Sequence, residues 1–192
     1  ATANLRRIVG SADGIQLTGR EDASAHHFAN VLYNNLRGGV FVRDHLLPAG
    51  DVAAFVRARH REVAARHESF LAGLPPALDV TDLHHAAAAT GDPDLRRLCL
   101  EYLPLYFGRR HGDPSRPWNR FSIHVRHADG SQALSYEGNW RDVFQNWEAL
   151  AASFPRFVPN VIAKFVNAST VDGFNPYRIT REGIDWEVEE PG

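Results

Sequence analysis

The stretch DVAAFVRARHREVAARHESFLAGL, residues 51–74, decides the fold class, because its apolar residues recur at the spacing of a helix. Its arginines and glutamates fall mostly on the opposite side. Asp51 is a suitable N-cap, and the pair Pro75-Pro76 ends the pattern. These residues predict one amphipathic helix over 51–74. Its apolar stripe would consist of Val52, Phe55, Val56, Val63, Phe70, Leu71 and Leu74.

Similar patterns lie on both sides of this helix. Further helices are predicted over 22–36, 82–89, 93–103, 141–154 and 159–167, with Asp92-Pro93 as a cap and first turn. Hairpins are predicted for 5–9 with 15–18 and for 120–126 with 132–136, around Asp-Gly turns, and a strand near 184–188. The predicted fold class is therefore mainly α, built of α/α hairpins with inserted β-hairpins.

The chain divides into three stretches within one domain or part of one. Residues 1–20 are a β-hairpin lead-in, and 21–117 are helical hairpins. Residues 118–192 contain a β-hairpin, helices and a turn-rich segment with the candidate site. A chain of 192 residues, of which 44% are hydrophobic, can bury a real core.

Composition excludes several kinds of partner. A net charge of −2 makes nucleic acid and acidic membranes poor partners, and no apolar run reaches the roughly 20 residues that span a bilayer. The chain has no Met and begins Ala-Thr-Ala-Asn, which suggests a piece of a longer protein. One lysine, Lys164, against twenty arginines favours a bacterial source, and we expect a cytoplasmic location.

Cysteine and histidine give no sign of a metal, a cofactor or an internal disulfide. The single Cys99 lies in an apolar helical pattern typical of a buried thiol. His26-His27 and His84-His85 are adjacent, so each pair points in diverging directions. The chain has no His-Glu-x-x-His and no Cys-x-x-Cys motif. We expect neither a metal site nor a cofactor.

Residues 136–148, YEGNWRDVFQNWE, make a poor core element, since all but Val143 are polar, aromatic or glycine. Asn167, 172–178 and 185–187 repeat this mixture. Flat rings beside amides, guanidinium groups and carboxylates suit a sugar, whose C–H face packs on rings while its hydroxyls need polar partners. A solvated helix anchored by its aromatic residues remains the alternative. The predicted substrate-binding residues are Asn139, Trp140, Arg141, Gln145, Asn146, Trp147, Asn167, Asp172, Asn175, Tyr177, Arg178 and Trp186.

Four carboxylates are candidates for glycoside chemistry, which needs one acid and one base or nucleophile. Asp142 is the predicted general acid, and Glu148, Asp185 or Glu187 is the second group. A phosphorolytic enzyme would need only one acid, with phosphate held by arginine, for which Arg141 and Arg178 are available. The sequence leaves hydrolysis and phosphorolysis open, and also retention and inversion.

The string YEGNWRDVFQNWEAL, followed by KFVNASTVDGFNPYRIT and GIDWEV, resembles a group of large, mostly uncharacterised bacterial proteins. These are placed near the six-hairpin α/α toroid glycosidases, which include cellobiose phosphorylase and glucoamylase. The resemblance is specific over 103–187 and weaker back to residue 19. It implies that this chain is an internal fragment of a longer α/α toroid protein, and Asp142 in Trp-Arg-Asp is similar to acid-bearing Trp-x-Asp segments of those enzymes.

These observations predict a carbohydrate-active enzyme, a glycoside hydrolase or phosphorylase, that acts on a small carbohydrate with or without phosphate. The rival is a non-catalytic carbohydrate-binding or structural fragment of a larger protein. A fragment of a toroid would expose apolar faces. We therefore expect either the remainder of its own longer chain or a second copy as a partner.

Overall fold

The computed structural model describes residues 2–12, 20–106 and 126–186. Helices dominate, joined by short antiparallel strand pairs, which confirms the mainly α prediction with inserted β-hairpins. The helices are α1 (Thr2–Gly10), α2 (Glu21–Gly38), α3 (Ala49–Arg59), α4 (Arg61–Arg66), α5 (Glu68–Ala72), α6 (Val80–Ala89), α7 (Pro93–Glu101), α8 (Trp140–Ser153), the 3-10 turn η1 (Pro155–Phe157) and α9 (Val158–Ala168).

The strands pair only with antiparallel neighbours. They are β1 (Val40–Phe41), β2 (Leu46–Pro48), β3 (Ala77–Asp79), β4 (Leu105–Tyr106), β5 (Glu137–Asn139), β6 (Arg178–Thr180) and β7 (Ile184–Asp185). β1 pairs with β4, β2 pairs with β3, and β5, β6 and β7 form a three-stranded sheet in that order. This sheet joins the two stretches of sequence in which we predicted the ligand site.

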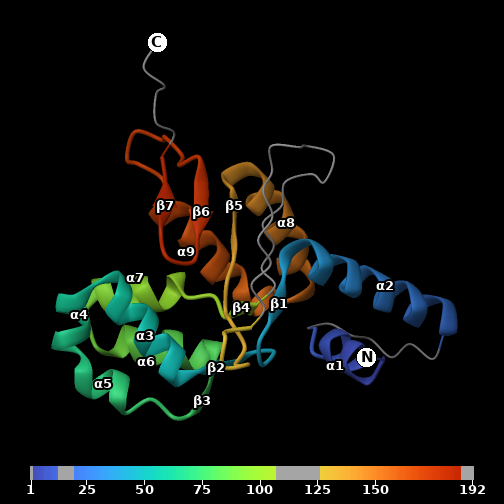
Figure 1. The fold of residues 1–192 in the computed structure, drawn as a ribbon, viewed down its shortest axis with the longest axis horizontal. Helices are drawn as coiled ribbons and strands as arrows, with labels where there is room; N and C mark the ends of the chain where they lie inside the picture. The colour runs from blue at the N-terminus through green and yellow to red at the C-terminus, as the bar shows by residue number, and fades with distance from the viewer. Residues whose placement is uncertain (1, 13–19, 107–125, 187–192) are drawn as a thin grey trace.

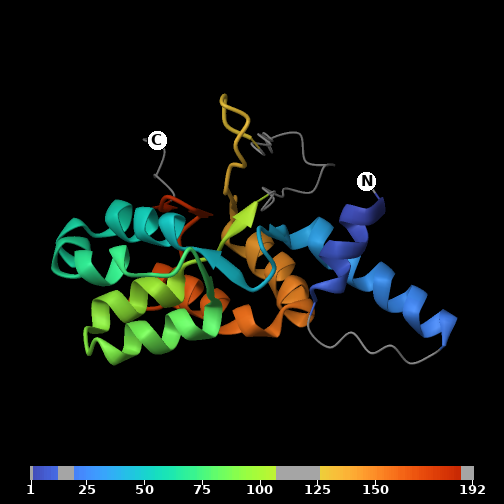
Figure 2. The same cartoon turned by 90° about the horizontal axis from the view of Figure 1, so that it is seen from below.

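Three groups of helices are arranged side by side (Figures 1 and 2). Helices α3 to α7 gather on one side, α1 and α2 extend on the other, and α8 and α9 lie between them. One hydrophobic core runs through all three groups, from Val9 to Ile179. Trp147 of α8 donates its indole N–H to the carbonyl oxygen of Gly38 in α2 at 3.1 Å, so residues predicted as separate stretches pack directly together.

The predicted single helix over 51–74 is wrong, because the chain folds there into α3, α4 and α5. The breaks fall at His60, which has extended backbone angles, and at His67. The His60 Nδ1 atom accepts from the backbone N–H of Val63 at 3.4 Å, and His67 Nε2 lies 2.8 Å from Asp92 Oδ2. Capping and a tertiary contact therefore outweigh the uninterrupted helical pattern.

Asp51 is not the N-cap that we predicted. Pro48 holds the cap position of α3, and Asp51 lies in its first turn. The Asp51 carboxylate instead accepts hydrogen bonds from Tyr102 Oη at 2.5 Å and from Arg181 Nη2 at 2.7 and 2.8 Å. The predicted cap of α7 is confirmed: Asp92 Oδ1 accepts from the N–H groups of Asp94 and Leu95, with Pro93 in the first turn.

The two predicted hairpins have different outcomes. Residues 5–9 belong to helix α1, with Ile8 and Val9 buried, so the lead-in strand is wrong, and 13–19 lie outside the described residues. Residues 120–125 also lie outside them. Beside that gap, Arg126 forms an antiparallel bridge with Gln132 around Gly130, whose φ is 82°. The turn therefore lies where the Asp129-Gly130 pair predicted it.

Candidate functional site

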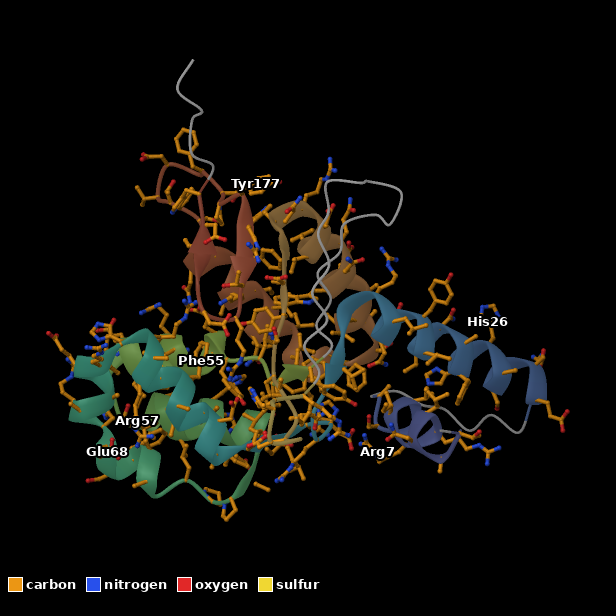
Figure 3. All side chains as sticks on the ribbon, in the orientation of Figure 1. Arg7, His26, Phe55, Arg57, Glu68 and Tyr177 are labelled. Atoms are coloured by element: carbon orange, nitrogen blue, oxygen red, sulfur yellow. The ribbon has the colours of Figure 1, made fainter. Side chains whose placement is uncertain are left out.

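A hollow of about 550 Å³ lies at the end of the three-stranded sheet, beside the loop that follows α9. Three aromatic side chains and two small polar ones line it: Thr170, Phe174, Asn175, Tyr177 and Trp186. Phe174 is 69% exposed, Tyr177 50% and Trp186 45%. Figure 3 labels Tyr177 near the outer end of the sheet. The described residues around this hollow are exposed rings and uncharged polar groups, which offer a surface for an amphipathic ligand.

The loop that supplies Phe174 and Asn175 is closed by its own hydrogen bonds. The backbone N–H of Thr170 donates to the carbonyl oxygen of Phe174 at 2.9 Å, and the N–H of Phe174 donates to Thr170 Oγ1 at 3.0 Å. Gly173 has a φ of 84°, which only glycine adopts at little cost. The turn that Asp172-Gly173 predicted therefore presents these side chains at the rim.

Strand pairing explains why Tyr177 and Trp186 meet. Arg178 lies opposite Asp185 in the β6–β7 pair, so the residues next to them, Tyr177 and Trp186, are neighbours across the strands. Side chains alternate between the two faces of a sheet, which places both rings on the face opposite that of Arg178. Ile179, the residue after Arg178 in β6, is buried in the core, whereas Tyr177 and Trp186 are about half exposed.

Asn175 is oriented by the end of α9. Its Oδ1 atom lies 3.0 Å from Ser169 Oγ. Its amide nitrogen has no hydrogen-bond partner within the described part of the chain, so it remains available as a donor to a ligand hydroxyl. Asp172, three residues before Asn175 in the same loop, is exposed.

The opposite face of the sheet is charged. Arg178 bridges two carboxylates: its Nη2 atom pairs with Glu137 of β5, and its Nη1 atom lies 3.4 Å from Asp185 Oδ2 of β7. The two predicted stretches of sequence therefore do fold together here. Arg178 is paired with two carboxylates and does not line the aromatic hollow, so the hollow and this charged face are separate surfaces.

Helix α8 distributes its predicted ligand residues over several surroundings. Trp147 is buried among Tyr136, Phe165 and the backbone of Gly38, so its ring offers no face to a sugar. Trp140 packs edge-on against Phe165 with 4.8 Å between ring centres. Trp140 and Trp147 therefore anchor α8 against Phe165 of α9.

The polar residues of α8 make local contacts or face solvent. Asn146 Oδ1 accepts from Arg37 Nε at 3.3 Å, which joins α8 to α2. Arg141 and Gln145 are exposed, and Asn139 of β5 is half-buried. Asn167 of α9 donates to Glu101 Oε2 at 3.3 Å.

The predicted catalytic carboxylates have different neighbours. Asp142 Oδ1 lies 3.8 Å from Arg141 Nε, in the first turn of α8, where the helix dipole favours negative charge. Glu148 lies in an apolar groove between α8 and α9. Asp185 pairs with Arg178 on the sheet, and Glu187 lies outside the described residues.

Sequence reasoning missed a buried ionic cluster beneath the sheet. Glu101 Oε1 accepts from Arg59 Nη2 at 2.6 Å and from Lys164 Nζ at 3.0 Å. Burial lowers the pKa of Lys164 to about 8, against the opposing charge of Glu101. Burial would raise the pKa of Glu101, but the charges of Lys164 and Arg59 outweigh it and hold that pKa below its ordinary value.

A compositional signal could have found this cluster. The chain uses arginine at twenty positions and lysine at one, and that lysine is only 1% exposed. A lysine can place a compact charge in a space too narrow for a guanidinium group. The isolated Lys164 therefore marked a tightly packed position.

No group of three or more His, Cys, Asp or Glu residues within 2–12, 20–106 and 126–186 is placed to hold a metal ion. No helix in the same ranges is long and apolar enough to cross a membrane.

One comparison with known protein families gives a match. Residues 45–104 match the model of a family described as glycoside hydrolase family 149 insertion domain 1. The matched segment runs from the start of β2 to the end of α7 and covers about a third of the chain. No curated protein matches the chain. The match supports a relation to glycoside hydrolase proteins and lies outside the aromatic hollow.

Proposed function

We propose that this chain is part of a carbohydrate-active enzyme, of glycoside hydrolase or phosphorylase type, and that it holds a neutral carbohydrate in the aromatic hollow. The similarity of residues 45–104 to a glycoside hydrolase insertion domain supports the class of protein. The observation that carries the binding function is the grouping of Phe174, Tyr177 and Trp186 around one uncharged hollow. The resemblance to toroid glycosidases adds the proposal that the longer protein is an α/α toroid.

The chemistry of the hollow favours a sugar with several hydroxyl groups. The rings of Tyr177 and Trp186 can pack on the C–H face of a pyranose, while Asn175 and Thr170 supply donors and acceptors to its edge. Among the residues that the structure describes, none with a charged side chain lines this hollow, so a uronic acid or sugar phosphate would lose water without gaining an ionic partner from them. These properties support a neutral glycan.

Binding suits this part of the protein better than catalysis. Asp142, Glu148 and Asp185 each have a different environment, and two of them lie beside an arginine. An acid–base pair has to flank one scissile bond, with its carboxyl groups roughly 5 to 10 Å apart. We therefore propose that the chain itself holds substrate, with hydrolysis or phosphorolysis carried out by the enzyme of which it is a part.

Isothermal titration calorimetry tests the binding function. The 192-residue chain is titrated with cellotetraose, maltotetraose and laminaritetraose, which differ only in linkage. We expect binding of at least one, and a loss of about tenfold in affinity for Tyr177→Ala and Trp186→Ala, since each removes a stacking surface. Tyr33→Ala is the matched control, because Tyr33 is an aromatic residue on α2 that is more exposed than Tyr177 or Trp186, and the variant should bind as the wild type does.

Equal affinities for the wild type and both hollow variants would refute the proposed binding site. Turnover of the same sugars, with and without inorganic phosphate, tests the division of roles. If Asp142→Asn abolishes sugar release but keeps binding, this chain supplies a catalytic acid, and the proposed division of roles is wrong. Intact turnover in Asp142→Asn, with binding lost in Tyr177→Ala, would support a binding role.

A further inference from the structure

Helix α9 buries two polar residues beside the apolar Phe165 and Ala168, and it leaves two large aliphatic residues exposed. Its inward face includes the buried residues Asn160 and Lys164, whereas Ile162 is 57% and Val166 64% exposed. Asn160 Nδ2 donates to the carbonyl oxygen of Tyr102 at 2.8 Å, and Lys164 pairs with Glu101. These contacts hold the two polar side chains on the buried side of α9. Ile162 and Val166, called here the apolar ridge of α9, therefore face outward.

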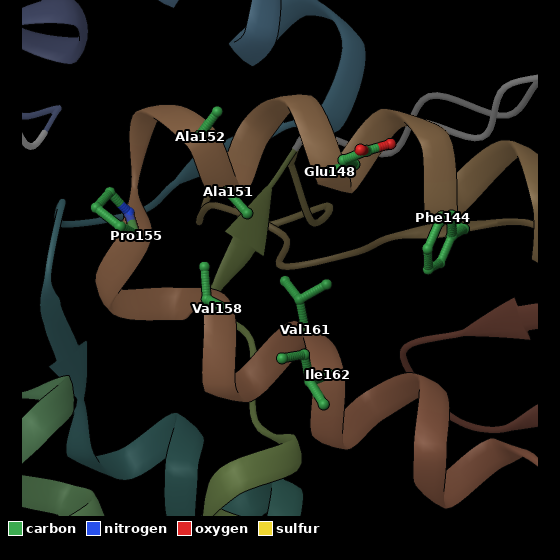
Figure 4. A pocket seen from close by; sticks show the side chains of 8 residues that line it. All are labelled: Phe144, Glu148, Ala151, Ala152, Pro155, Val158, Val161 and Ile162. Atoms are coloured by element: carbon green, nitrogen blue, oxygen red, sulfur yellow. The ribbon is translucent and has the colours of Figure 1, made fainter.

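Grooves lie on both sides of this ridge. Figure 4 shows the groove between α8 and α9, a hollow of about 450 Å³ whose lining is apolar except for Glu148. A second groove of about 640 Å³ lies between α7 and α9 and carries Arg96 and Arg97. Val158 and Ile162 line both grooves, so the two form one continuous apolar face.

The two edges of this face carry opposite charges. Arg96 and Glu148 are exposed, and neither has an ion-pair partner among the residues that the structure describes. Arg97 lies 3.6 Å from Glu101 and is thereby tied to the buried cluster. The face thus offers an apolar centre with one free positive edge and one free negative edge.

We propose that this face binds a second copy of the same chain in a two-fold symmetric dimer. Symmetric association requires a patch that is complementary to itself. A two-fold axis along α9 exchanges the α7 side with the α8 side, so that Arg96 of each copy lies opposite Glu148 of the other. The ridge of one copy, formed by Ile162 and Val166, then covers the apolar surface of the second.

Charge and apolar contacts have different roles in this dimer. Removal of apolar surface from water is the main driving force of association, so the exposed parts of Ile162 and Val166 of both copies supply most of the affinity. The two Arg96–Glu148 contacts fix the orientation, because reversing one sign places like charges together twice. A dimer built in this way is independent of the aromatic hollow, which lies on the sheet.

Sedimentation velocity of the 192-residue chain at increasing micromolar concentrations tests this proposal. We expect reversible dimerisation, lost in Ile162→Asp and in Val166→Asp. Tyr33→Asp is the matched control, because Tyr33 is at least as exposed but lies on α2, and it should dimerise like the wild type. All variants change solvent-exposed positions, and circular dichroism verifies that each is folded.

A charge exchange tests the two-fold arrangement. Arg96→Glu and Glu148→Arg should each weaken the dimer by roughly tenfold, and the double variant, which restores opposite charges in both contacts, should recover it. A chain that stays monomeric throughout, or a dimer that neither Ile162→Asp nor the charge reversals affect, would overturn the proposal. Failure of the double variant to recover would overturn the stated orientation.

Discussion

Lys164, Glu101 and Arg59 form one buried ionic cluster that holds three helices together. The Lys164 ammonium of α9 reaches the Glu101 carboxylate of α7, and Arg59 of α3 binds the same carboxylate oxygen. An ion in such a place has lost its hydration, so removal of one partner leaves a charge without full compensation. Stability at this position therefore depends on the complete cluster.

Lys164→Met, which keeps much of the side-chain volume and removes the charge, should lower the free energy of unfolding by about 2 to 4 kcal/mol. Arg57→Met provides a matched control, because the Arg57–Glu68 pair is similarly short, at 2.6 Å, but exposed, and its loss should cost at most about 1 kcal/mol. Urea unfolding at neutral pH measures both. Equal losses would show that burial adds nothing at Lys164.

Glu101 also makes stability depend on acidity. The pKa of Glu101 is lower in the folded chain than in the unfolded chain, so its contribution is present above the unfolded pKa and is lost as the pH falls through the folded pKa. Glu101→Gln should be less stable at neutral pH yet lose less stability between neutral and acid pH. Thermal unfolding across that range measures it, and parallel curves for both proteins would contradict the prediction.

At the scale of elements, the sequence predicted local features better than their limits. Asp92 caps α7 as expected, because capping depends on neighbouring residues alone. The break of the 51–74 pattern at His67 depends on Asp92, which lies in a different segment, and α1 replaced a strand although Asp13-Gly14 suggested a turn. The His67–Asp92 contact joins residues that are distant in sequence, and the periodicity of 51–74 does not contain it.

The contact between α2 and α8 depends on Gly38. A Cβ atom at this position would lie 2.6 Å from Leu150 Cβ and 3.0 Å from the carbonyl oxygen of Asn146. Gly38→Ala should therefore destabilise the chain by about 1 to 3 kcal/mol through overpacking. Chemical denaturation provides the measurement.

Gly50 in α3 is the control for Gly38, since nothing lies within 4 Å of its added Cβ. Gly50→Ala should leave stability unchanged or raise it by up to about 1 kcal/mol, because alanine favours the helix. Similar effects of the two substitutions would mean that α2 and α8 are not in close contact at Gly38.

At the scale of the whole molecule, the sequence predicted only some of the residues that line the proposed binding hollow. The β5–β6–β7 sheet pairs 137–139 with 178–180, so the two stretches lie side by side. The described residues that line the hollow come from the second stretch, so the two stretches do not share one hollow there. The turn signals of 172–177 led to Asn175, Tyr177 and the rim of the hollow. Composition could not separate rings that anchor a helix, such as Trp147, from rings that face solvent, because both kinds have the same neighbours in sequence.

Phe174 lines the hollow, although the composition of its segment did not single it out as a ligand-binding residue. It lies in the same stretch as Asn175 and Tyr177, but it was not among the residues predicted to bind ligand. Its exposure follows from the closed loop, which turns it outward. The β6–β7 pairing of Arg178 with Asp185 brings their neighbours Tyr177 and Trp186 to the same hollow, which local sequence does not contain.

Indole N–H signals in a ¹H–¹⁵N spectrum of the 192-residue chain, recorded during titration with cellotetraose, maltotetraose and laminaritetraose, test the central claim most directly. We predict that the Trp186 indole signal shifts and saturates with at least one of them, while the Trp147 indole, buried and bonded to Gly38, stays in place. A Trp186 signal that remains unmoved by all three sugars would contradict the account.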